Sequence, residues 1–217
     1  MEGNMRKSGR PIKVLLAALL IPIVLIGCAP KIKPDESAKI MCNFIIKNDK
    51  TKISELVSDQ KEVNGYYKKL KDSFTNKLKD GVSGEGVNIS DDQYKQICDA
   101  YLKAIKNITI TTKQVSVDGD TAVVNVKTNY IDMNEIVKKA EGQATEDIMS
   151  MGLTDEEEAK NKAVEVYLKY VIQDLNEAKP KSETINKDFK FKKGGQGWIP
   201  QDENDFEKQL GKMICKE

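Results

Sequence analysis

The sequence predicts an α+β domain with N-terminal helices, an antiparallel four-stranded sheet made of two hairpins, a pair of helices inserted between the hairpins, and a C-terminal helix. Three observations predict this fold. Apolar residues recur at helical spacing through residues 35–105, and the period then changes to two through residues 108–130. Alternation returns at residues 183–192, after two further helical stretches. Because nothing repeats, we expect a single domain over residues 35–217.

Helices are expected first along the chain, at residues 35–47, 53–57 and 62–79. Ser90 then opens the most strongly patterned helix as a capping box, because the Gln93 side chain can bond back to the Ser90 amide. The apolar stripe of this helix consists of Tyr94, Ile97, Cys98, Tyr101, Leu102 and Ile105.

The first hairpin follows these helices. Ile108, Ile110 and Thr112 alternate with other residues, and Asp118-Gly119 is a tight-turn signal before a return strand at 121–130. On the return strand, the side chains expected to share the buried face are Ala122, Val124, Val126, Thr128 and Tyr130.

Two helices are expected between the hairpins. Asp132 caps the first, with Glu135 at the third position, and Gly152 ends it. Thr154 opens the second as a capping box with Glu157, and this helix continues to about residue 179.

The second hairpin and a last helix complete the chain. Strands are expected at residues 183–192 and 197–199 around a Gly194-Gly195 turn, and a helix at residues 203–215.

The N-terminus has the organisation of an export signal. Four basic residues precede the apolar run 14–26, which is too short to span a membrane and contains Pro22. The run closes on Leu25, Ile26, Gly27 and Cys28. This tetrapeptide resembles the lipobox of bacterial lipoproteins, in which signal peptidase II recognises the first three residues and the cysteine is lipidated.

The resemblance implies a signal peptide at residues 1–27, a lipid-anchored tether at 28–34, and a diacylglyceryl group, with acyl chains such as palmitate, on Cys28. The protein is then expected on the extracytoplasmic face of the cell membrane, with the membrane as its partner through Cys28. The only arginines are Arg6 and Arg10, a lysine bias that favours a Gram-positive host; in a Gram-negative host the domain would face the periplasm or outer membrane.

Composition excludes several function classes. Cleavage before Cys28 leaves two more acidic than basic residues, with the charges interspersed, so no nucleic acid partner is expected. Histidine is absent, which excludes Ser-His-Asp and Cys-His nucleophiles and histidine metal ligands. The acids at 155–158 and at 202–207 crowd helix starts, where they favour capping and solubility over a metal site. We therefore expect no catalytic residue, no metal and no cofactor.

Two segments carry a resemblance for the domain itself, residues 117–124 and 194–199. They look like the small secreted lipoproteins whose domain is of unknown function, which are similar to cystatin-like and nuclear transport factor 2-like half-cones. That resemblance implies a curved sheet wrapped around a long helix. The inserted helices at 133–179 depart from the compact form of that fold.

Candidate ligand-binding residues are aromatic. Trp198, Tyr130 and Tyr101 either line a cleft between sheet and helices or pack in the core. Cys42, Cys98 and a third thiol, Cys215, remain after lipidation and form either one disulfide with a spare thiol or three buried free thiols.

The sequence favours a non-enzymatic module that binds a small ligand or an envelope protein. The alternatives are an envelope hydrolase that works through paired carboxylates and a structural or immunity-type partner of another exported protein.

Overall fold

The computed structural model describes residues 30–82 and 89–216. It confirms the α+β class, with the element order α1 (Pro34–Lys47), the short 3-10 helix η1 (Ile53–Glu55), α2 (Gln60–Val82), α3 (Asp91–Ile105), β1 (Ile110–Asp118), β2 (Thr121–Thr128), β3 (Ile131–Asp132), α4 (Met133–Ser150), α5 (Glu156–Glu177), β4 (Ile185–Lys193), β5 (Trp198–Pro200), α6 (Glu203–Ile214) and β6 (Cys215–Lys216).

The main sheet has four antiparallel strands in the order β1-β2-β4-β5. Its first hairpin turns at Gly119, whose φ of +56° is the left-handed conformation that glycine adopts without strain. The second hairpin closes through a 2.8 Å hydrogen bond from the Gly194 amide to the Gly197 carbonyl. As predicted, α4 and α5 lie between the two hairpins. A separate two-stranded parallel pair joins β3 to β6.

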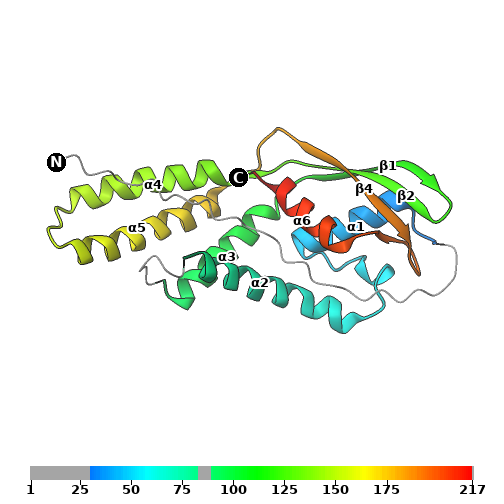
Figure 1. Cartoon of the computed structure of the whole chain (residues 1–217), viewed down its shortest axis with the longest axis horizontal. Coiled ribbons are helices and arrows are strands. Elements are labelled where there is room, and N and C mark those ends of the chain that lie inside the picture. Colours follow the sequence, from blue (N-terminus) through cyan, green and yellow to red (C-terminus); the bar gives the residue numbers. More distant parts are fainter. Residues whose placement is uncertain (1–29, 83–88, 217) are drawn as a thin grey trace.

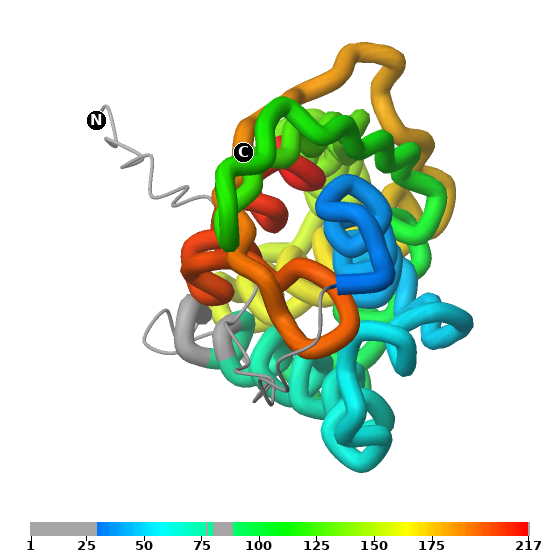
Figure 2. The backbone as a smooth tube through the Cα atoms, turned by 90° about the vertical axis from the view of Figure 1, so that its right-hand side faces the viewer, coloured from blue at the N-terminus to red at the C-terminus, as the bar shows by residue number. Residues whose placement is uncertain are grey.

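Apolar and polar side chains alternate along the strands, so one face of the sheet is buried in the core. On β2, Ala122, Val124, Val126 and Thr128 are buried, as predicted. Helices α1 and α6 lie on this face (Figures 1 and 2). Thr112 of β1 donates a 2.8 Å hydrogen bond to the Asp35 carbonyl of α1. On the α6 side, Phe206 makes T-shaped ring contacts with two residues of β4, Phe189 and Phe191.

Helices α4 and α5 form an antiparallel hairpin that projects away from the sheet (Figure 1). Helix α3 contacts α5 and joins this hairpin to the rest of the molecule. The predicted capping box of α3 is present, with the Gln93 amide donating to Ser90 Oγ at 3.3 Å and the Ser90 amide donating to Gln93 Oε1 at 2.8 Å.

The start of α5 differs from the prediction. Asp155, not Thr154, is the N-cap, and its carboxylate accepts a 2.8 Å hydrogen bond from the Glu158 amide. Both residues can cap a helix and both precede a glutamate by three positions, but aspartate is the stronger capping residue. The helix therefore begins one residue later than predicted, and it ends at Glu177 rather than near residue 179.

The described part of the tether is attached to the second hairpin. The amides of Lys31 and Ile32 both donate to the Gln196 carbonyl, at 2.9 and 3.3 Å. The chain is thus held against the β4–β5 turn before α1 begins at Pro34.

Candidate functional site

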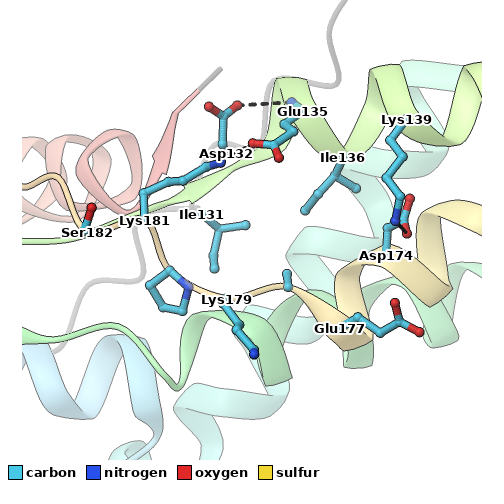
Figure 3. A pocket seen from close by; sticks show the side chains of 12 residues that line it. Ile131, Asp132, Glu135, Ile136, Lys139, Asp174, Glu177, Lys179, Lys181 and Ser182 are labelled. Atoms are coloured by element: carbon cyan, nitrogen blue, oxygen red, sulfur yellow. Dashed lines mark hydrogen bonds and ion pairs between the residues drawn. The ribbon is translucent and has the colours of Figure 1, made fainter.

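A cavity of about 490 Å³ opens where the base of the α4–α5 hairpin meets β3 (Figure 3). Three segments form it: residues 131–139 from β3 and α4, residues 174–177 from α5, and the connection 178–182 that leads to β4. We call it the α4–α5 pocket.

Local hydrogen bonds fix the walls of the pocket. Asp132 caps α4 as predicted, with its Oδ1 accepting a 3.1 Å hydrogen bond from the Glu135 amide. The Lys181 amide donates to the Tyr130 carbonyl at 2.9 Å, which holds the 178–182 connection beside β3. The first turn of α4 and the 178–182 connection are thus held in place, and they position the side chains that line the pocket.

The lining combines apolar and charged groups. Ile131, Ile136, Ala178 and Pro180 supply apolar surface. The charged residues of the lining are Asp132, Glu135, Asp174, Glu177, Lys139, Lys179 and Lys181.

Asp174 is the most unusual of these residues. Its side chain is 3% exposed, and its Oδ1 accepts a 2.5 Å hydrogen bond from Lys139 Nζ. Its second oxygen, Oδ2, is buried and has no hydrogen-bond partner within the described residues. Leaving a buried acceptor unsatisfied costs free energy, more when the acceptor belongs to a charged group. A carboxylate held this way can accept donors from a bound molecule.

Two lysines of the pocket are engaged with its acids. The hydrogen bond to Asp174 raises the pKa of Lys139, and the nearby charges of Asp174, Glu177 and Glu135 add to the effect. The pKa of Lys181 is raised in the same way by its hydrogen bond and ion pair with Glu135. Both ammonium groups therefore stay charged at neutral pH.

The predicted aromatic residues do not line the α4–α5 pocket. Trp198 is 5% exposed in the core, where its backbone amide donates to Ser37 Oγ at 3.0 Å. Tyr101 stacks on Phe74, with its hydroxyl 3.2 Å from Cys215 Sγ. Tyr130 is also buried, and only its carbonyl reaches the pocket wall, through the Lys181 amide. A ligand-binding role for the three rings stays a prediction.

The three cysteines of the described chain, Cys42, Cys98 and Cys215, are free and buried, which is one of the two predicted alternatives. Burial raises the pKa of the Cys42 thiol to about 12 and that of Cys98 to about 11.

The acidic clusters have structural roles. Asp155 and Asp202 are helix N-caps. Within residues 30–82 and 89–216, no group of three or more cysteine, aspartate or glutamate side chains is arranged to hold a metal ion. The assignment of Glu207 to capping and solubility is wrong, because it is 5% exposed and its Oε1 accepts a 3.2 Å hydrogen bond from the Tyr66 hydroxyl. It lies on the inward face of α6, one residue after Phe206.

Sequence reasoning missed Asp174 and the pocket. A signal was present, since Asp174 follows Tyr167 by seven residues and Tyr170 by four and so falls on the stripe that packs α5. An acid at such a position needs a buried partner, which Lys139 supplies.

The predicted lipidation residues, Leu25, Ile26, Gly27 and Cys28, lie outside the described residues, as does the rest of the predicted signal peptide. Among the described helices, none has the length and apolar character needed to cross a membrane.

Comparison with known proteins supports the fold and identifies the family. A crystal structure of a Bacillus subtilis subsp. subtilis str. 168 protein described as a lipoprotein (ycdA) is similar, with a TM-score of 0.62 at 17% identity over 84% of this chain. The match spans 56% of that chain, so this chain corresponds to little more than half of it. No curated protein matches. The profile of the domain of unknown function DUF5105 matches residues 32–214, and the chain therefore belongs to the DUF5105 family.

Proposed function

We propose that the protein is an exported lipoprotein whose folded domain is a non-enzymatic small-ligand-binding module, with the α4–α5 pocket as its binding site. The observation that carries the binding function is the buried Asp174 carboxylate, which lines the pocket and has an oxygen without a partner in the described chain. Sites for small ligands combine apolar walls with a few placed polar groups, and the volume of about 490 Å³ is in their usual range.

The lipidation proposal rests on the sequence Leu25-Ile26-Gly27-Cys28 behind a basic, apolar leader. The description of the Bacillus subtilis neighbour as a lipoprotein supports it, and so does the family match that begins only at residue 32. The lysine bias of the chain and this neighbour favour a Gram-positive cell, with the domain on the outer face of the membrane. The position of α1 on the sheet also supports the resemblance to cystatin-like and nuclear transport factor 2-like half-cones.

A non-enzymatic role is supported by how the pocket acids are engaged. Three of the four acids that line the pocket are engaged: Asp174 with Lys139, Glu135 with Lys181, and the Asp132 carboxylate with the first turn of α4. The fourth, Glu177, therefore has no second free acid beside it in the lining. Hydrolysis through paired carboxylates needs one acid free to donate a proton and one free to accept it.

The anchor is tested by detergent phase partition and palmitate labelling in the cell. The wild-type protein is expected in the detergent phase and labelled, and Cys28→Ser is expected to carry no label. Cys98→Ser is the matched control, because its thiol is buried in the domain, and it should behave as wild type. Label on the Cys28→Ser protein would refute the anchor.

Binding is tested by native mass spectrometry of the Cys28→Ser protein after incubation with envelope extract of its own host. A discrete small-mass adduct, lost in the additional variant Asp174→Asn, supports the proposal. A protein-sized adduct would instead support a structural or immunity-type partner. A bare mass alone would contradict the binding function.

A further inference from the structure

We infer that the α4–α5 pocket recognises an alkylammonium group, a primary amine on an aliphatic chain, with the Asp174 carboxylate as its anionic contact. This inference rests on the proposed function and names the ligand class of the same site.

The first step is the state of Asp174. Side-chain oxygens of Asp35, Asn48, Glu62 and Gln143 are also buried without a partner, but those residues are only half-buried as a whole, whereas Asp174 is 4% exposed. Asp174 also lines the pocket. An ionised carboxylate only accepts hydrogen bonds, so the group that satisfies Oδ2 must be a donor.

The charges around the pocket decide which donor fits. Four carboxylates and three lysines line it, and the lysines Lys139 and Lys181 are already paired with acids. Figure 3 shows Lys179 pointing away from Asp174. An anionic ligand would therefore meet carboxylates, while a cation gains charge-assisted hydrogen bonds.

The walls indicate what carries the cation. Ile131 and Ile136 point into the pocket in Figure 3, and Ala178 and Pro180 add further apolar groups to its lining. These groups offer no hydrogen bonds from their side chains, so they suit a run of methylene groups.

Lys139 shows the binding mode within the molecule itself. Its side chain is flexible and 54% exposed, and its ammonium already donates a hydrogen bond to Asp174 Oδ1. A ligand ammonium displaces it, the Lys139 side chain moves into solvent, and the incoming group bonds both Oδ1 and Oδ2. Lys139 is therefore a competitor of the ligand, and its removal should strengthen binding.

Two sources supply this chemistry, a free aliphatic amine and the lysine side chain of a peptide. Isothermal titration calorimetry of the detergent-solubilised, full-length protein separates them with two probes, 1,5-diaminopentane and Nα-acetyl-lysine methylamide. Glutarate, with carboxylates at a similar spacing, is the control of opposite charge. At least one amine is expected to bind, and glutarate is not. The tighter amine identifies the source.

Two variants should change the affinity in opposite directions. Asp174→Asn is expected to weaken amine binding about tenfold or more, since it removes a charge-assisted contact. Lys139→Met is expected to strengthen it about tenfold, because the internal ammonium is gone and the carboxylate is left uncompensated. Lys160→Met is the matched control, because it removes an ammonium that pairs with an exposed acid of α5, Glu156, outside the pocket lining, and it should stay within about twofold of wild type. Lys139→Met keeps Asp174, so this arm remains informative even if Asp174→Asn does not fold.

The inference is overturned if neither amine binds wild type or Lys139→Met, or if folded Asp174→Asn binds amines as wild type does. A small-mass adduct from envelope extract in the absence of amine binding would overturn the ligand class and leave the proposed function standing. If both the adduct and amine binding are absent, the proposed function fails as well.

Discussion

The sheet half of the molecule, formed by β1, β2, β4 and β5 with α1 and α6, is built very differently from the α4–α5 hairpin. The sheet half buries bulky side chains such as Phe44, Phe191 and Phe206, each at most 2% exposed. The hairpin has a narrow seam with Ala140 and Ala144, and no residue from 145 to 165 is buried within this fully described range. Stability is thus concentrated in the sheet half, and the polar site lies at the base of the hairpin, where the seam ends.

The largest expected effect is truncation in the aromatic core. Phe191 is 0% exposed and contacts the Phe206 ring edge-on, so Phe191→Ala should lower the free energy of unfolding by about 3–5 kcal/mol. Met149→Ala at the hairpin tip, where the side chain is 77% exposed, should change it by less than about 0.5 kcal/mol. Urea unfolding measures both. Equal losses in the two variants would contradict the unequal distribution of stability.

Glycine substitutions should have opposite signs in the two regions. A Cβ at Gly197 would lie 2.3 Å from Leu56 Cδ2 and 2.7 Å from Ser37 Oγ, so Gly197→Ala should destabilise by about 1–3 kcal/mol. At Gly142 in α4 a Cβ meets nothing within 4 Å, so Gly142→Ala should stabilise by about 0.5–1 kcal/mol. The melting temperature is expected to fall in the first variant and rise in the second. A rise in both would show that the β4–β5 turn is not tightly packed.

A smaller effect is expected at the start of α5. Asp155→Ala removes the N-cap hydrogen bond to the Glu158 amide and should cost about 1 kcal/mol. Thr154→Ala is the matched control and should cost less than about 0.5 kcal/mol. Hydrogen exchange at the Glu158 amide gives a local measurement. Faster exchange in Thr154→Ala than in Asp155→Ala would restore the sequence-based prediction.

The last prediction concerns the reactivity of the thiols and does not involve a change in stability. Because burial raises the pKa of Cys42 to about 12, about one part in 10⁴ of its thiol is ionised at pH 8, compared with a much larger share for an exposed cysteine. In the Cys28→Ser protein, native Cys42, Cys98 and Cys215 should react with a thiol reagent only after denaturation. Addition of Met149→Cys should give one fast-reacting thiol at the hairpin tip. A fast thiol without that substitution would mean that the element carrying it opens readily.

Most of the fold was predictable because each signal is local. Gly119 at the hairpin turn and the Ser90 and Asp132 caps act within a few residues of sequence, and all three are confirmed. Thr154 and Asp155 offered two overlapping caps, and only the choice between them was wrong. The place of Asp174 on the packed stripe of α5 was a signal of its burial, but the partners of Asp174 and Glu207 could not be predicted. These partners, Lys139 and Tyr66, lie 35 and 141 residues away in the sequence. Contacts between residues so far apart in the sequence depend on tertiary packing, and the pocket is formed by contacts of this kind.

The attachment of Lys31 and Ile32 to Gln196 sets how an anchored molecule would stand on its membrane. Lys31 follows Cys28 by three positions, a reach of about 10 Å at full extension. With a lipid on Cys28, the β4–β5 turn would rest close to the headgroups. Figure 1 places this end opposite the loop that joins α4 to α5. The helical hairpin would then point outward from the cell. Its tip, which carries the acidic first turn of α5, would be the most distant part of the protein, and the charged pocket would lie partway up, above the lipid surface.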